Sequence, residues 1–221
     1  MHAEVLVLAV ASAVRPSTST AAVYALLSSD RPRPVLAAFT GAGLLFSCAV
    51  GVIVVSALHG VSLPGGASTR TAIVDLAAGA AMLGFASGAW SGHVERLRQR
   101  RGERSAPRIV TALRRPTIKV AATAGAVTHL PGLFYLVALN AITADDPAVA
   151  RAVVEVVGYN LVWFSVPIAA IVVARRAAEG MHAWIARVNA WAKAHEQTIV
   201  VVVFGSVGTY LVVKGVSGLL S

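Results

Sequence analysis

The sequence predicts an all-α integral membrane protein with six spanning helices, arranged as two inverted repeats of three helices each. Of its 221 residues, 57% are hydrophobic and only 13% are charged, whereas soluble domains carry about 25% charged residues. The apolar residues also come in blocks of about 20, the length that a helix needs to cross about 30 Å of hydrocarbon. Both observations indicate that the bilayer surrounds most of the chain.

The first half contains three predicted spans, residues 3–28, 35–58 and 71–92. The turn SSDRPRP separates the first span from the second, and the Gly- and Pro-rich loop HGVSLPGGAS separates the second from the third. Residues 93–117 follow as the longest polar stretch, rich in arginine. We therefore place the boundary between the two halves in this stretch.

The second half contains predicted spans at residues 118–142, 149–174 and 198–219. The acidic turn TADDPA joins the first two. Residues 178–195, before the last span, predict an amphipathic helix in the membrane interface, because apolar residues recur there at helical spacing: Met181, Trp184, Ile185, Val188 and Trp191.

The distribution of basic residues predicts the orientation. Fifteen of the 19 Lys and Arg residues lie in or beside segments 29–34, 93–117 and 175–197, which the positive-inside rule places in the cytoplasm. We expect a multi-pass protein of the cytoplasmic membrane with both termini outside. The formal charge of +9 is then a topological signal, with anionic membrane lipids as a further partner of the basic loop, and no nucleic-acid partner is expected.

The two halves show an internal similarity. Residues 12–27, SAVRPSTSTAAVYALL, and residues 125–139, GAVTHLPGLFYLVAL, both contain a small residue, Ala-Val, a proline and a tyrosine. Each segment opens a set of three helices, so the halves are expected to have opposite orientations, as in many secondary transporters. Pro16 and Pro131 lie near the middle of their spans and interrupt backbone hydrogen bonding there. The alternative is that Ala- and Val-rich helices resemble each other by composition alone.

Arg15 is the strongest candidate for a binding residue. A charge near the centre of a span costs at least a few kcal/mol unless it is paired or hydrated. A guanidinium can hold a phosphate, sulfate or carboxylate with two hydrogen bonds, and the hydroxyls of Ser17 to Thr20 can complete such a site. The alternative is a structural ion pair with Asp75 or Glu155.

His129 lies at the matching depth of the fourth span, where it could relay a proton or simply bond a carbonyl that Pro131 frees. Asp75 and Glu155 are proton-binding candidates, partners for Arg15, or interfacial residues. Asn160, Tyr24 and Tyr135 are candidate polar lining, with packing as the alternative. The predicted substrate-binding set is Arg15, Pro16, Ser17, Thr18, Thr20, His129, Pro131 and Asn160.

No catalytic motif stands out in the sequence. There is no Walker loop, no HExxH and no Gly-x-Ser-x-Gly. The histidines lack metal-ligand spacing, and the single cysteine, Cys48, allows neither an intramolecular disulfide nor a CxxC pair. We expect no enzymatic activity, no metal and no cofactor.

The chain resembles the GAP, or sulfolipid-1-addressing protein (Sap), family of actinobacteria, which is placed within the lysine-exporter superfamily. Motifs in family order carry the resemblance: the first helix with its proline, the Asp-Arg-Pro turn, the Gly-rich second helix, the basic central loop and the Leu-Pro-Gly motif of the fourth helix. The resemblance implies a role in exporting cell-envelope glycolipids, often alongside large lipid transporters. The family commonly has Asn before the first-helix proline, where this chain has Arg15, which favours an anionic headgroup.

The leading hypothesis is therefore a transporter or export accessory for an envelope lipid or its anionic precursor. One alternative is a proton-coupled exporter of small solutes such as amino acids. The other is a non-transporting scaffold for envelope-lipid machinery. Expected partners are the lipid or another anionic small molecule and a large lipid exporter, and Gly- and Ala-rich packing permits a homodimer.

Overall fold

The computed structural model describes residues 3–14, 22–23, 26–27, 29, 31–58, 66–93, 96, 116–144, 148–176, 187, 190–191 and 194–220. All regular structure in these ranges is α-helical. The predicted binding residues Arg15, Pro16, Ser17, Thr18 and Thr20 lie outside the described residues. So do Tyr24 and most of the predicted central loop and interfacial helix.

Eight helices form the described part of the chain. They are α1 (Ala3–Val14), α3 (Pro32–Leu58), α4 (Gly66–Trp90), α7 (Ile118–Thr128), α8 (Leu133–Thr143), α9 (Val149–Trp163), α10 (Ser165–Arg176) and α12 (Glu196–Leu220). Three segments are long and apolar enough to cross a membrane, namely Pro32–Ala57, Thr71–Trp90 and Glu196–Leu220. The number rises to five if the pairs α7–α8 and α9–α10 each count as one bent span.

Large apolar side chains on the outer faces of several helices are exposed, including Leu45, Ile53, Val154, Val202 and Val213. Soluble monomers rarely expose so much contiguous apolar surface, whereas a lipid-facing surface requires it. The structure therefore agrees with an α-helical membrane protein.

Both bent pairs have a proline at or just after the bend. α7 and α8 meet at 63°, and Pro131 lies between them, where its missing N–H prevents the helix from continuing. Gly132 then adopts an extended conformation (φ −93°, ψ 175°) as the N-cap of α8. α9 and α10 meet at 57° around Phe164, and Pro167 in the first turn of α10 cannot donate a hydrogen bond back to Trp163.

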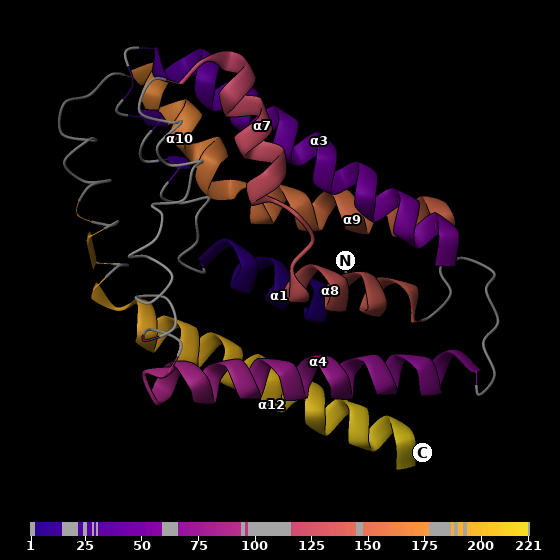
Figure 1. Cartoon of the computed structure of the whole chain (residues 1–221). Helices are drawn as coiled ribbons and strands as arrows, with labels where there is room; N and C mark the ends of the chain where they lie inside the picture. The colour runs from indigo at the N-terminus through magenta and orange to yellow at the C-terminus, as the bar shows by residue number, and fades with distance from the viewer. Residues whose placement is uncertain are drawn as a thin grey trace.

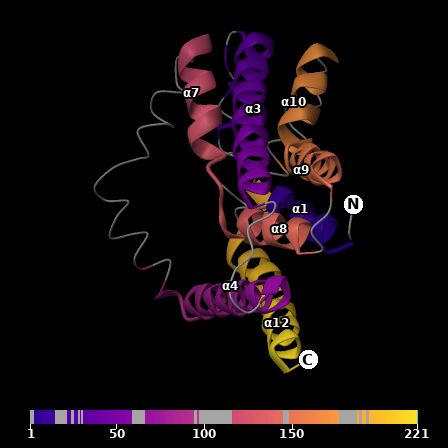
Figure 2. The ribbon, with the colours of Figure 1, turned by 90° about the vertical axis from the view of Figure 1, so that its right-hand side faces the viewer.

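The helices form three layers (Figure 1). α4 and α12 lie side by side in one outer layer, and α3, α7, α9 and α10 form the other. The short helices α1 and α8 lie between them, and the rotated view shows the same order (Figure 2). The main core fills this middle layer, and nearly all of α8 is buried, including every residue from Val137 to Thr143.

Glycines allow two helix pairs to approach closely. A Cβ at Gly79 of α4 would lie 2.8 Å from the carbonyl oxygen of Gly208 on α12, and one at Gly215 would lie 2.8 Å from that of Ala72. On the other side, a Cβ at Gly125 of α7 would overlap the Phe39 carbonyl of α3. Small residues at helix crossings are typical of membrane proteins, where close van der Waals packing drives association.

Candidate functional site

The two helix bends meet inside the protein at His129. This residue caps the C-terminus of α7 and is only 1% exposed. Its imidazole stacks on Phe164, which lies at the bend between α9 and α10, with ring centroids 4.2 Å apart. Phe39 and Trp163 pack edge-on against the same imidazole. We call the set His129, Phe164, Ser47, Tyr135 and Asn160 the break centre.

The hydrogen bonds of His129 fix the orientation of its ring. Nδ1 lies 2.8 Å from the carbonyl oxygen of Gly125. Because a carbonyl oxygen can only accept a hydrogen bond, Nδ1 carries the proton and donates the hydrogen bond to the Gly125 oxygen. The His129 side chain therefore satisfies the buried Gly125 carbonyl of α7. This is the histidine that the sequence analysis selected because it lies close to Pro131.

A chain of buried hydrogen bonds crosses the break centre from α7 to α9. Ser47 of α3 donates to the His129 carbonyl at 3.1 Å, and the Tyr135 hydroxyl of α8 donates to the Ser47 carbonyl at 2.7 Å. Asn160 of α9 then donates from Nδ2 to the Tyr135 oxygen at 3.1 Å. His129 and Asn160, both predicted binding residues, thus belong to one network.

The network offers one acceptor for a further polar group. Asn160 is fully buried, and its Oδ1 has no hydrogen-bond partner among the described residues. An unsatisfied buried carbonyl is costly, so a ligand hydroxyl or amine donor would gain by bonding it. Beside it, Tyr159 packs against Tyr135 and makes a 2.6 Å hydrogen bond to Ser12, which ties the end of α1 to the break centre.

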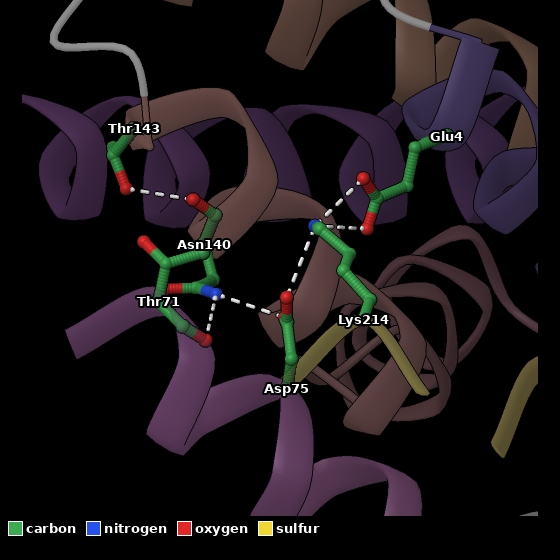
Figure 3. Close-up of polar contacts among 6 residues, drawn as sticks. All are labelled: Glu4, Thr71, Asp75, Asn140, Thr143 and Lys214. Atoms are coloured by element: carbon green, nitrogen blue, oxygen red, sulfur yellow. Dashed lines mark hydrogen bonds and ion pairs between the residues drawn. The ribbon is translucent and has the colours of Figure 1, made fainter. Parts of the chain in front are cut away.

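A second polar site lies where α1, α4, α8 and α12 meet (Figure 3). The Lys214 ammonium lies 2.8 Å from both carboxylate oxygens of Glu4 and 3.0 Å from Oδ2 of Asp75. Asn140 donates to Oδ1 of Asp75 at 3.1 Å and is 3.5 Å from the Thr71 carbonyl. We call Glu4, Lys214, Asp75 and Asn140 the ion cluster.

The two acidic residues that the sequence analysis proposed, Asp75 and Glu155, therefore lie in different parts of the structure. Asp75 pairs with Lys214 in the ion cluster, and Glu155, also buried, pairs with Arg151 one turn earlier at 3.5 Å. Pro131 marks the bend beside His129. Among the described positions, no group of three or more His, Cys, Asp or Glu residues is arranged to hold a metal.

Sequence reasoning missed Glu4, Lys214 and Asn140 as site residues. The sequence did contain a signal for Glu4 and Lys214, because an ionisable residue inside an apolar span is a functional candidate by default. Glu4 and Lys214 both interrupt such spans, but they are 210 residues apart and nothing in the sequence pairs them.

The family model of the sulfolipid-1-addressing protein (Sap) matches residues 5–217 of the chain. The chain belongs to the Sap family. No curated protein and no solved structure matches it. The Sap match covers the whole break centre and all of the ion cluster except Glu4.

Proposed function

We propose that this Sap protein moves an anionic cell-envelope lipid or glycolipid across the cytoplasmic membrane, alone or as an accessory to a larger lipid exporter. The family supports the substrate class. The observation that carries the proposal is the meeting of two bent helix pairs at the His129–Phe164 stack. Broken helices supply backbone groups for ligands near the midplane of many transporters.

The predicted anion site follows α1 directly in the sequence. Ser12, near the end of α1, bonds Tyr159 of α9, and Arg15 follows Ser12 by three residues in the sequence. We therefore assign the headgroup to Arg15 and the hydroxyls of Ser17, Thr18 and Thr20, with Asn160 Oδ1 as an acceptor for a sugar or glycerol hydroxyl. Pro16 and Pro131 would keep backbone carbonyls available at this depth.

The proposal includes six spans in two inverted repeats, as in the lysine-exporter superfamily. The packing supports it, because elements in corresponding positions of the two halves lie against each other. α1 packs on α8, α3 on α9 and α10, and α4 on α12. A pseudo-two-fold axis in the membrane plane produces such pairs. The positive-inside distribution supports an arrangement with both termini outside.

Partners beyond the substrate are also proposals. The basic segment 93–117 suits anionic lipids of the cytoplasmic leaflet, and a large exporter would receive the lipid if this protein acts as an accessory. The exposed apolar faces of α4 and α12 leave room for a homodimer.

The test is lipid profiling of the envelope in the source organism. Deletion should remove or reduce one anionic surface lipid, and the wild-type chain should restore it. Arg15→Ala should fail to restore it, whereas Arg187→Ala, a matched change at an exposed position, should succeed. An unchanged lipid profile after deletion, or full rescue by Arg15→Ala at equal protein abundance, would contradict the proposal.

A second candidate is a proton-coupled exporter of small solutes. The enclosed character of the break centre favours it, because His129 and Asn160 are almost completely shielded from solvent. In that case deletion would leave the surface lipids unchanged, and the purified protein in vesicles would release an amino acid or similar solute when a pH gradient is applied.

A further inference from the structure

Two carboxylates share one ammonium in the ion cluster. Lys214 contacts both oxygens of Glu4 and one oxygen of Asp75, and Figure 3 shows its ammonium between the two acids. With all three groups ionised, the three side chains carry one negative charge in excess. Such an excess is unfavourable in a poorly hydrated site, and the addition of one proton removes it.

Within the part of the chain that the structure describes, the other charged and titratable groups around Glu4 do not balance this excess. From α12, Tyr210 interacts with Glu4, Lys214 and Asp75, but a phenol is neutral near pH 7. α8 contributes the neutral amide of Asn140. α9, which also packs on α1, carries Arg151 and Glu155, and these two residues pair with each other. Within the described residues, Lys214 is therefore the cation that both acids contact.

The two acids differ in how well they could accept a proton. Asn140 donates a hydrogen bond to Oδ1 of Asp75, the Lys214 ammonium lies 3.0 Å from Oδ2 as an ion pair, and the Asp75 side chain is 1% exposed. This burial shields Asp75 from protons outside the core. The Glu4 side chain is 16% exposed and lies beside the half-exposed Tyr210, so a proton can reach it from outside the core.

We propose that the ion cluster is a proton-binding latch in which Glu4 takes up one proton and releases α1 from α12. The proton adds to a carboxylate oxygen of Glu4, and the ion pair between Glu4 and Lys214 is lost. Lys214 stays protonated and remains paired with Asp75, so the cluster becomes neutral. The Asp75–Asn140 hydrogen bond continues to hold α4 to α8.

The latch would act on α1 while its other end stays attached. Ser12 is bonded to Tyr159 at 2.6 Å and α1 also packs on α8 and α9, so loss of the Glu4 contact removes the ion pair that joins α1 to α12 and lets these two helices move apart. This inference rests on the proposed function in one respect, since the segment after Ser12 carries the predicted anion site.

The experiment measures the distance between α1 and α12 in the full-length protein. Cys48 is first replaced by Ser, and spin labels are attached at Val7→Cys and Val213→Cys, which are both exposed positions. Double electron–electron resonance then reports the distance between the two labels in lipid nanodiscs without added substrate. Between about pH 8 and about pH 4, the distribution should shift to longer or broader distances, because the lower value reaches the range in which a glutamate carboxyl ordinarily titrates. An unchanged distribution overturns the proposal.

Two variants assign the change to Glu4. Glu4→Gln, which is permanently neutral, should show at both pH values the distance distribution that the wild type shows at acid pH. A wild-type distribution of this variant at about pH 8 would overturn the proposal.

Asp75→Asn removes the excess negative charge while keeping Glu4, so the pH at which the distance changes should be lower than in the wild type. An unmoved transition would contradict the shared-charge argument. The matched control Glu196→Gln, at the opposite end of α12, should keep the wild-type response.

Lipid profiling separates this proposal from the proposed function. A Glu4→Gln strain that fails to deliver the lipid but shows no change in distance refutes the latch and leaves the proposed function standing. A clear pH response in a protein whose deletion changes no envelope lipid supports the latch and refutes the proposed function.

Discussion

The imidazole of His129 stacks on the phenyl ring of Phe164 at a centroid distance of 4.2 Å. The two residues belong to different bent helix pairs, and this contact is where the bends meet. Neither ring could be replaced without leaving one bend unsupported, because both residues are almost completely buried.

Removal of the Phe164 ring should destabilise the protein. We expect Phe164→Ala to lower the free energy of unfolding by about 3–5 kcal/mol, as for large-to-small changes in a packed core. Phe164→Leu keeps most of the apolar volume and should lose less than half of this amount. SDS titration in mixed micelles measures both variants, and equal losses would show that the ring stack, rather than the buried apolar volume, accounts for the effect.

The crossing of α3 and α7 should not tolerate a side chain at Gly125. A Cβ there would overlap the backbone carbonyl of Phe39, which cannot move without shifting α3. Gly125→Ala should cost about 1–3 kcal/mol through overpacking and lower the Tm in detergent. Gly41→Ala, at a position with open space, serves as the control and should leave the Tm unchanged or slightly higher.

The hydroxyl pair Ser12–Tyr159 should behave as a coupled unit. Each single variant, Ser12→Ala or Tyr159→Phe, leaves a buried hydroxyl without this partner and should cost about 1–3 kcal/mol. The double variant should cost less than the sum of the two, with a coupling energy of at least about 0.5 kcal/mol. Additive losses in the unfolding titration would mean that the 2.6 Å contact does not stabilise α1.

Loss of Lys214 should leave two acids without their shared cation. Lys214→Met is expected to cost about 3–5 kcal/mol near neutral pH, because the removal of one partner from a buried ion pair leaves an uncompensated charge. The loss should shrink as the pH falls, since protonation neutralises the acids. Lys119→Met, at an exposed position, should have no such effect. A loss independent of pH would indicate a packing defect.

Hydropathy and proline content predicted much of the framework. The apolar blocks gave the membrane class and the approximate helix positions, and Pro131 predicted an interruption that the structure places between α7 and α8. The bend at Phe164 was not predicted, and residues 149–174 were expected as one uninterrupted helix. Pro167 was the available signal, because its missing N–H removes a hydrogen bond at Trp163.

The sites were harder to predict because their contacts are distant in sequence. His129, Asn160 and Tyr135 were predicted from their polarity in apolar spans, but Ser47, which connects His129 to Tyr135, is recognisable only once the helices are packed. For Asp75, Arg15 was considered as a partner, and the partner in the structure is Lys214. No local pattern indicates which helices become neighbours, so such pairings require the fold.

The burial of α8 has a consequence for how the protein is made. At 11 residues the helix is about 16 Å long, too short to cross about 30 Å of hydrocarbon by itself. Of the helices that contact it in the described part of the chain, α1, α3 and α4 precede it, whereas α9 and α12 follow. During synthesis the first half can therefore cover much of α8 as soon as it emerges, whereas in a second half made alone the faces of α8 that contact α1, α3 and α4 would have no partner.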